Sequence, residues 1–208
     1  NAWGNKYPEI LATDAGIPDK MADLLGVRKF HPGIVLEGGS IDVNGCGTLI
    51  TTESCLLNRN RNPHLSRKDI EQHLADWLGI EKVVWLTEGV AGDDTDGHID
   101  DITRFINSET VVTVVEENER DPNYEALYRN YELLCRTRTE DDSSLNVLVL
   151  PMPAPLIEDG ERLPASYANF YISNAAVIVP TFNDVNDRVA LGILGELFRD
   201  RPVVGIHA

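Results

Sequence analysis

Short apolar runs of strand length alternate along the chain with segments whose apolar residues recur at helical spacing. This spacing predicts helices over residues 17–27, 66–78, 123–136 and 186–198. The second is the best defined, because Ser66 and Asp69 form a capping box at its start and Gly79 follows its end. The apolar runs predict strands, which are GIVLEGG at 33–39, KVVWL at 82–86, NVLVLPM at 146–152 and PVVGI at 202–206.

Three further pairs of runs predict hairpins: SIDV with GTLITT, ITRFI with TVVTVV, and NFYIS with AAVIVP. In the first pair, Asn44 and Gly45 indicate a two-residue turn. The helix over 66–78 places four apolar side chains on one face: Ile70, Leu74, Trp77 and Leu78.

The predicted elements follow one another in the order helix, strand, loop and hairpin, and this unit recurs at intervals of roughly 50 to 60 residues. A fourth copy begins with the helix over 186–198 and the strand over 202–206. Such a repeat predicts an α/β propeller-like or stacked array rather than a doubly wound sheet. If the copies surround an axis, the loops after their strands meet at one end, which would bring Glu37 to the acidic loop 92–101.

The composition narrows the class of protein. The chain has 208 residues, 42% of them apolar, and a formal net charge of −16. This charge argues against binding to nucleic acid or to anionic membranes. It is compatible with a small cationic partner, but an acidic surface that serves solubility alone explains it as well. No apolar run reaches the length of a membrane span, and the N-terminus does not have the pattern of a signal peptide.

The three cysteines, Cys46, Cys55 and Cys135, form no CxxC pair. The sequence therefore indicates neither a disulfide framework nor a zinc site, and a reducing, cytoplasmic location is the simpler prediction. None of the three has the surroundings of a nucleophile, so each is interpreted as structural.

The most unusual stretch is GDDTDGHIDD at 92–101, which places five aspartates around one histidine. His98 and Asp100 are two residues apart, so in an extended segment both side chains reach the same side. A carboxylate accepts two hydrogen bonds from a planar guanidinium, and a histidine transfers protons near neutral pH. Glu37 precedes two glycines after an apolar run, where a carboxylate would favour the protonated form of His98.

The other aspartates, including Asp94 and Asp96, carry more negative charge than one proton transfer requires, so a cation is expected beside them. A divalent metal and an organic cation are the two candidates. The spacing does not match a calcium loop of the EF-hand type, which needs a glycine at its sixth position and a glutamate at its twelfth.

Three long motifs carry a family resemblance: FHPGIVLEGGSIDVNGCGTLITTESCLLNRNRNPHLSR, GDDTDGHIDDITRF and PASYANFYISNAAVIVPTFNDVND. With them the chain closely resembles the agmatine deiminases of the peptidyl-arginine deiminase-like family. The resemblance implies the pentein fold, a five-bladed α/β propeller. It also implies hydrolysis of agmatine to N-carbamoylputrescine and ammonia, a step of putrescine and polyamine biosynthesis, by a cysteine thiolate and without a metal or organic cofactor.

The resemblance also implies roles for particular residues. His98 matches the proton-transferring histidine, Glu37 the carboxylate paired with it, and Asp100 a carboxylate that binds the guanidinium. Asp94, and less directly Asp96, falls where the family recognises the distal amine of agmatine. A further substrate contact is expected from Trp3, near the entrance.

The chain also departs from the family pattern. The nucleophilic cysteine and a second guanidinium-binding aspartate have no match, so residues 1–208 are expected to form one partial pentein domain that lacks the N-terminal part and the C-terminal segment with the nucleophile. Such a piece is expected to be inactive by itself. Asp101 stands where asparagine is expected, which we interpret as a tolerated surface change.

Two other functions stay open at this point. One is a deiminase acting on arginine or peptidyl-arginine, and the other is a non-catalytic, cation-binding pentein module. A partial propeller exposes the edges of its blades, which leaves a homo-oligomer open as well.

Overall fold

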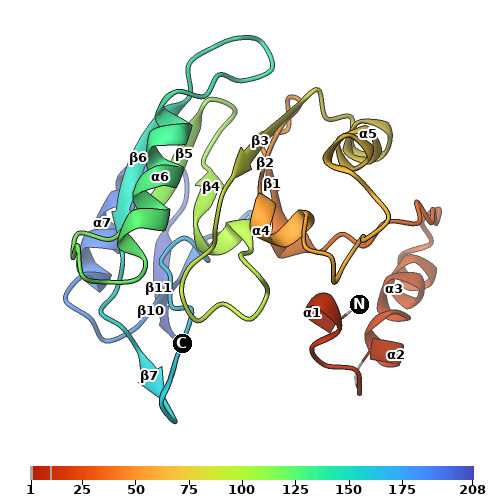
Figure 1. Ribbon diagram of the computed structural model, residues 1–208. Coiled ribbons are helices and arrows are strands. Elements are labelled where there is room, and N and C mark those ends of the chain that lie inside the picture. The colour runs from red at the N-terminus through yellow and green to blue at the C-terminus, as the bar shows by residue number, and fades with distance from the viewer. Residues whose placement is uncertain (1, 10) are drawn as a thin grey trace.

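The computed structural model describes residues 2–9 and 11–208, although not the side chains of residues 2, 11 and 12, and it is an α/β fold with three three-stranded sheets (Figure 1). In each sheet, the first two strands form an antiparallel hairpin and the third runs parallel to the second. The strands are β1 (Ile41–Val43), β2 (Thr48–Thr52) and β3 (Lys82–Leu86); β4 (Thr103–Phe105), β5 (Thr110–Val115) and β6 (Asn146–Pro151); and β9 (Tyr171–Ile172), β10 (Val177–Thr181) and β11 (Val203–His207).

A helix connects the second and third strand of each sheet, because parallel strands need a long crossover. These helices are α5 (Arg67–Leu78), α6 (Tyr124–Cys135) and α7 (Asp187–Leu197). The unit that repeats in space is therefore hairpin, helix, strand. The sequence pattern grouped each strand with the hairpin that follows it, and this grouping was wrong. The strand β3, for example, pairs with the hairpin that precedes it, with Thr48 opposite Lys82.

The segment GIVLEGG is not a strand, contrary to the prediction. Residues 34–37 have no regular secondary structure, and a 3₁₀ turn η1 (Gly38–Ser40) follows. The third strands β3, β6 and β11 each pair with a hairpin that precedes them in the chain. Residues 2–9 and 11–33 contain no strand, so the segment GIVLEGG has no preceding hairpin to pair with. The apolar run still packs, because Ile34 and Leu36 lie against a small core cluster around Leu49 and Leu74.

The predicted end signals of α5 are confirmed. The Ser66 hydroxyl accepts a hydrogen bond from the backbone N–H of Asp69, and the Asp69 carboxylate accepts one from the backbone of Ser66. Gly79 ends the helix in the left-handed conformation, with φ of 69°. The first hairpin turn is longer than predicted, because the side chain of Asn44 accepts hydrogen bonds from three backbone N–H groups and orders all of residues 44–47.

Shorter elements complete the chain: the helices α1 (Ala2–Asn5), α2 (Leu11–Asp14), α3 (Ile17–Leu25) and α4 (Glu53–Leu56), the 3₁₀ turn η2 (Ile99–Asp101), and the small hairpin β7 (Ile157–Glu158) with β8 (Glu161–Arg162). Sequence reasoning missed this hairpin, although Asp159 and Gly160 are the turn signal for it. Both adopt positive φ angles, of 50° and 85°.

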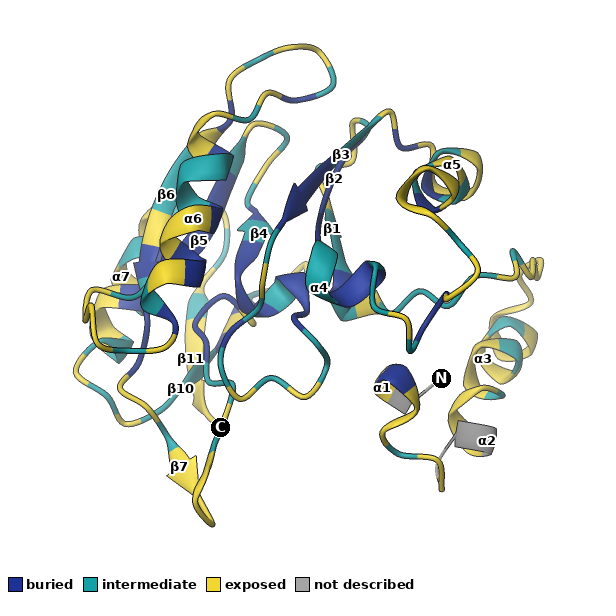
Figure 2. Ribbon diagram, viewed as in Figure 1, coloured by how far each residue is buried: buried dark blue, intermediate teal, exposed yellow. Residues whose placement is uncertain are grey.

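The core lies between the sheets and their helices. Figure 2 shows buried residues concentrated along β3, β4 and β5, whereas α3 and β7 are largely exposed. On the apolar face of α5, Ile70 and Leu74 are buried, but Trp77 and Leu78 are about half exposed. The predicted apolar face of α5 is thus only half covered by the residues described, and Trp77 contacts the ring of Phe30 with centroids 6.0 Å apart.

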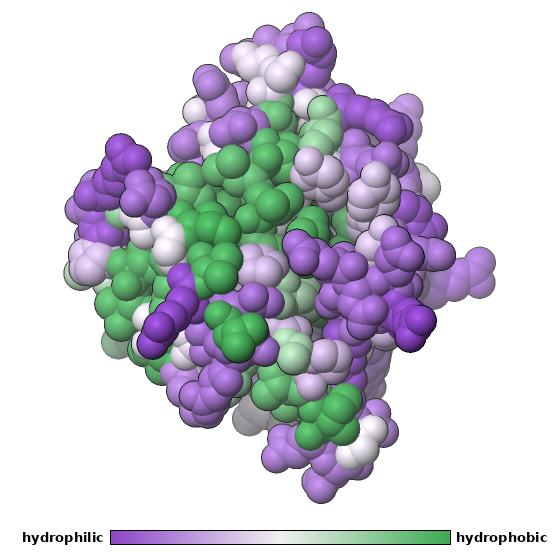
Figure 3. All heavy atoms as spheres, turned by 90° about the vertical axis from the view of Figure 1, so that its left-hand side faces the viewer, coloured by the Kyte–Doolittle hydropathy of each residue, from purple (hydrophilic) through white to green (hydrophobic). Residues whose placement is uncertain are grey.

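One side of the molecule carries much apolar surface (Figure 3). Exposed apolar side chains occur on the third strands of two sheets and on the strand beside β11: Val149, Val204, Ile206 and Ile178. Among the residues that the structure describes, no helix is both long enough and apolar enough to cross a membrane.

Candidate active site

The acidic loop between β3 and η2 is ordered by one of its own aspartates. Asp93 accepts hydrogen bonds from the backbone N–H of Thr95 at 2.7 Å, of Gly97 at 2.8 Å and of His98 at 3.0 Å. Both carboxylate oxygens of Asp93 are thereby engaged within the loop. The loop also needs Gly97, whose φ is 100° and whose backbone lies against that of Gly89.

The loop brings His98 to Glu37. The Nε2 atom of His98 lies 2.7 Å from Oε2 of Glu37, and the His98 side chain is only 9% exposed. Burial raises the pKa of Glu37, but hydrogen bonds from His98 and Arg61 outweigh it, so the pKa of Glu37 lies below its ordinary value. Glu37 is therefore an ionised carboxylate at neutral pH. The pairing predicted from sequence is present in the structure.

Asp100 lies on the other side of His98, at a cavity of about 220 Å³. The lining of this cavity includes Asp42, Arg104, Asn169 and Phe170 as well as Asp100. Burial raises the pKa of Asp100, and the charges of His98 and Arg104 oppose this rise. A partly desolvated carboxylate beside a cavity is suited to bind a cation.

Gly39 separates His98 from Asp100. A Cβ atom on Gly39 would lie 2.5 Å from Nδ1 of His98 and 2.7 Å from Oδ2 of Asp100. These two side-chain atoms therefore face the same small space above the Gly39 backbone. The H-x-D spacing predicted this proximity for an extended segment, whereas residues 99–101 form the 3₁₀ turn η2. Only glycine leaves this space open.

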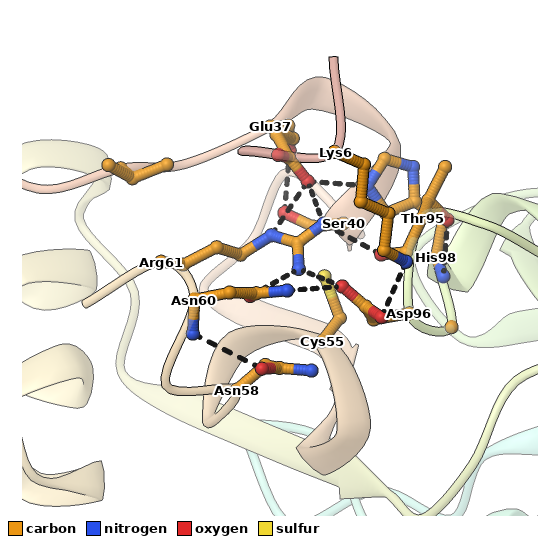
Figure 4. A network of polar contacts seen from close by, with 12 residues as sticks. Lys6, Glu37, Ser40, Cys55, Asn58, Asn60, Arg61, Thr95, Asp96 and His98 are labelled. Carbon is orange, nitrogen blue, oxygen red and sulfur yellow. Dashed lines mark hydrogen bonds and ion pairs between the residues drawn. The ribbon is translucent and has the colours of Figure 1, made fainter. Parts of the chain in front are cut away.

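Asp96 is held by three side chains (Figure 4). Its carboxylate accepts hydrogen bonds from Lys6 at 2.7 Å, from Asn60 at 2.8 Å and from Arg61 at 2.7 Å. Burial raises the pKa of Asp96, but these partners prevail and lower it to about 2. Asp96 is thus already neutralised by residues of the chain itself.

Asp94 is more accessible than Asp96. Its side chain is exposed, and its carboxylate accepts a hydrogen bond from the hydroxyl of Tyr7, while Lys6 contacts its backbone carbonyl. Trp3 lies on the same N-terminal segment, with its ring 5.3 Å from that of Tyr7 and 42% of its surface exposed. Of the two predicted amine-binding aspartates, Asp94 is therefore the one left open to a ligand.

Asp101 is not a surface residue, which corrects the interpretation drawn from sequence. It is 8% exposed, and its Oδ1 accepts a hydrogen bond from the side chain of Asn169 at 2.9 Å. Burial and the nearby charge of Asp100 raise the pKa of Asp101 to about 7. Asp101 follows directly on the half-buried Asp100 and points into the protein, so its charge is costly.

The cysteines have distinct surroundings. Cys55 is fully buried after β2, and burial raises its pKa to about 12, which makes it a poor nucleophile. Cys46 lies exposed in the first hairpin turn, and Cys135 is exposed at the end of α6.

Glu37, Cys55 and His98 present possible metal-ligand atoms within 4.8 Å of one another. Arg61 is bonded to Glu37, however, and its positive charge opposes a metal ion at this position. The geometry fits an organic site better than a metal centre.

Sequence reasoning missed the residues that balance the acidic loop. Arg61, Lys6, Asn60 and Tyr7 come from two distant segments and carry no periodic signal. A cation was expected beside the crowded aspartates, and the chain itself provides part of the positive charge. Arg61 and Lys6 both form ion pairs with Asp96.

The profile of the Porphyromonas-type peptidyl-arginine deiminase family matches residues 1–208. The chain belongs to this family. The resemblance inferred from the three sequence motifs is thereby confirmed.

Proteins similar to this chain include agmatine deiminases. The agmatine deiminase of Pseudomonas syringae pv. tomato is 38% identical over an alignment of 226 residues that covers 98% of this chain and 61% of the relative. A cysteine-to-serine variant of the C. jejuni agmatine deiminase, solved with substrate bound, is 37% identical and superposes with a TM-score of 0.91 over 100% of this chain and 61% of its own. The Enterococcus faecalis agmatine deiminase gives a TM-score of 0.86 at 38% identity, over 91% and 57%.

This family member therefore spans about 60% of the length of the relatives it matches. The superpositions support the α/β fold described above over nearly the whole chain.

Proposed function

We propose that the intact protein hydrolyses agmatine to N-carbamoylputrescine and ammonia, as a cytoplasmic enzyme of putrescine biosynthesis. The observation that carries this proposal is the Glu37–His98 pair at 2.7 Å, with Asp100 beside it and Asp94 exposed on the same loop. Agmatine has a guanidinium at one end and an amine at the other, and these carboxylates match both charges. Relatives named agmatine deiminase support the substrate.

In the proposed reaction, a cysteine thiolate attacks the guanidinium carbon and a covalent thiouronium forms after ammonia leaves with a proton from His98. His98 then takes a proton from water, whose oxygen adds to the same carbon. As the C–S bond breaks and the thiolate is released, the remaining hydroxyl proton is lost to solvent and a carbamoyl group is left on the amine. One guanidinium and one water thus give one carbamoyl group and one ammonia, which takes up a proton in solution. Asp100 holds the guanidinium in place, and the ionised Glu37 keeps His98 oriented.

One acceptor of the site remains for the substrate. Oε1 of Glu37 is buried and has no hydrogen-bond partner among the described residues. A buried carboxylate oxygen without a donor is costly, so a guanidinium N–H of the substrate would satisfy it.

The nucleophile is proposed to come from outside these 208 residues. Cys55 is buried with a raised pKa, and Cys46 and Cys135 lie in a hairpin turn and at a helix end. We propose that this chain is one partial pentein domain whose three hairpin–helix–strand units belong to a five-bladed propeller, and that it is inactive by itself. The repeated topology of its sheets supports the propeller.

A change of Gly39→Ala is expected to lower kcat for agmatine about 100-fold in the intact protein. The new methyl group would lie too close to the side chains of His98 and Asp100 and would push both out of their positions in the site. The atoms it meets are the ends of side chains, so folding should survive. Ammonia release measures the first effect and thermal unfolding the second. The matched control is Gly192→Ala on α7, where a Cβ meets nothing within 4 Å; wild-type turnover in Gly39→Ala would contradict this geometry.

Specificity for agmatine is proposed to come from Asp94. Asp94→Asn removes a charge from the exposed end of the site and should raise the KM for agmatine about 10- to 100-fold, with a smaller change in kcat. Initial rates with agmatine and with arginine as substrates measure this. Asp76→Asn, an exposed change on α5, serves as the control.

A second candidate is a deiminase acting on arginine or peptidyl-arginine, favoured by the description of the family itself. An α-carboxylate would lie near Asp94 and be repelled, which is why agmatine is preferred here. If arginine is turned over faster than agmatine, or if Asp94→Asn leaves the preference unchanged, the amine-binding role of Asp94 is wrong.

A further inference from the structure

Arg61 uses every one of its donors inside the site. Its side chain is 1% exposed. Nε and Nη2 donate to Oε2 of Glu37 at 2.9 and 2.7 Å, Nη2 also donates to the Thr95 carbonyl at 2.7 Å, and Nη1 donates to Asp96 at 2.7 Å and to Asn60 at 3.1 Å. A guanidinium has five N–H donors, and five contacts are made. Such a complete set is typical of a buried arginine with a fixed position.

Arg61 joins two segments that sequence places far apart. Glu37 precedes η1, whereas Thr95 and Asp96 belong to the acidic loop that also carries His98. Because one planar group binds both, the distance between Glu37 and the loop is set by the guanidinium (Figure 4). A lysine has one point charge and cannot bridge the same acceptors.

The contact between Arg61 and Glu37 also fixes the histidine. Two N–H groups of Arg61 stabilise Glu37 as a carboxylate, and an ionised carboxylate only accepts hydrogen bonds. The Nε2 atom of His98, 2.7 Å away, must then carry the proton whether the ring is neutral or charged. The proton that comes and goes is therefore on Nδ1, the atom that faces the space above Gly39 and Asp100.

We infer that Arg61 is a positioning residue for the proposed reaction: it holds Glu37 ionised and in place, so that His98 presents Nδ1 to the substrate. This inference rests on the proposed function for the meaning of Nδ1. The orientation of His98 by Arg61 is a property of the protein without substrate and can be tested separately.

The kinetic test compares Arg61→Gln and Arg61→Lys with Arg129→Gln in the intact protein. Arg129 is exposed on α6 and pairs with Glu88, so its change should leave turnover as it is. Arg61→Gln is expected to lower kcat about 100-fold and to lower it more than it raises the KM for agmatine. Loss of the positive charge also moves the acid limb of the pH profile of kcat/KM upward by about one to two units.

Arg61→Lys retains a charge, so its acid limb should move less, while kcat stays well below that of the wild type. A merely structural role predicts a different pattern: kcat would fall with the fraction of folded protein and the pH profile would not move. An unchanged profile in folded Arg61→Gln would overturn the inference. If Arg61→Gln does not fold, the test rests on folded Arg61→Lys, which must show a lower kcat than the wild type. A wild-type kcat in folded Arg61→Lys would then overturn the inference.

Proton NMR of the histidine rings tests the orientation without any substrate. The wild type should show a slowly exchanging Nε2–H signal, assigned by its absence in His98→Ala, and Arg61→Gln should lose it while Arg129→Gln keeps it. A retained signal in Arg61→Gln would overturn the inference. If the intact wild type does not hydrolyse agmatine but its signal depends on Arg61, the proposed function fails and the positioning of His98 by Arg61 stands.

Discussion

Replacing His98 with alanine in the intact protein is expected to lower agmatine turnover at saturating substrate by roughly 10²- to 10⁴-fold, the usual contribution of a general acid–base group. Without the imidazole, ammonia has no proton donor as it leaves and water has no base when it attacks. The KM should change much less, because Asp94 and Asp100 supply the charges that bind the substrate. Ammonia release and N-carbamoylputrescine formation, followed at several pH values, measure the effect.

The matched control is His64→Ala, since His64 is exposed on the loop that follows α4. It should retain wild-type turnover. Glu37→Gln should be intermediate, because its amide can still contact His98 but no longer carries the charge that holds the ring in one orientation. Turnover by His98→Ala within tenfold of the wild type, in folded protein, would remove His98 from the proton transfers.

The change Asp101→Asn is expected to stabilise the protein at pH 8 by up to about 4 kcal/mol, and to have little effect at pH 4. The folded pKa of Asp101 is about 7, above its ordinary value of 3.8, because the carboxyl is buried beside Asp100. Between these two pH values the unfolded chain has lost the proton and the folded chain keeps it. Rising pH therefore favours unfolding, and asparagine removes this penalty while its oxygen still accepts the hydrogen bond from Asn169.

Urea denaturation at pH 4, 6 and 8 measures this difference in the free energy of unfolding. Because other groups titrate in the same range, the relevant quantity is the variant minus the wild type at each pH. Asp76→Asn, on the exposed side of α5, should show no such trend. Equal stability of Asp101→Asn and the wild type at pH 8 would show that Asp101 is ionised in the fold at little cost.

Features encoded in short stretches were predicted well. The ends of α5 follow from Ser66, Asp69 and Gly79, whose effects act within one helical turn. His98 and Asp100, two residues apart, also face one space as expected, but they do so through the 3₁₀ turn η2 and not through the extended segment on which the expectation rested.

Features that depend on distant partners were predicted poorly. An apolar run such as 33–39 has the composition of a strand, but a strand also needs a neighbouring chain to pair with. Trp77 lies on the apolar face of α5 and is nevertheless exposed, and Asp101 has an ionisable side chain and is nevertheless buried. Whether a face is covered is decided by other elements of the fold.

By itself the sequence determined most of the local elements, the family, and the chemical identity of the acidic loop, because caps, turns, periods and motifs are written in neighbouring residues. The tertiary structure decided how that loop is used. It assigned Asp93 to the backbone of the loop and Asp96 to Lys6, Asn60 and Arg61, and it left Asp94 exposed. Only the fold brings residues 6, 37, 61 and 96 together, and the charge of a carboxylate depends on the partners that reach it.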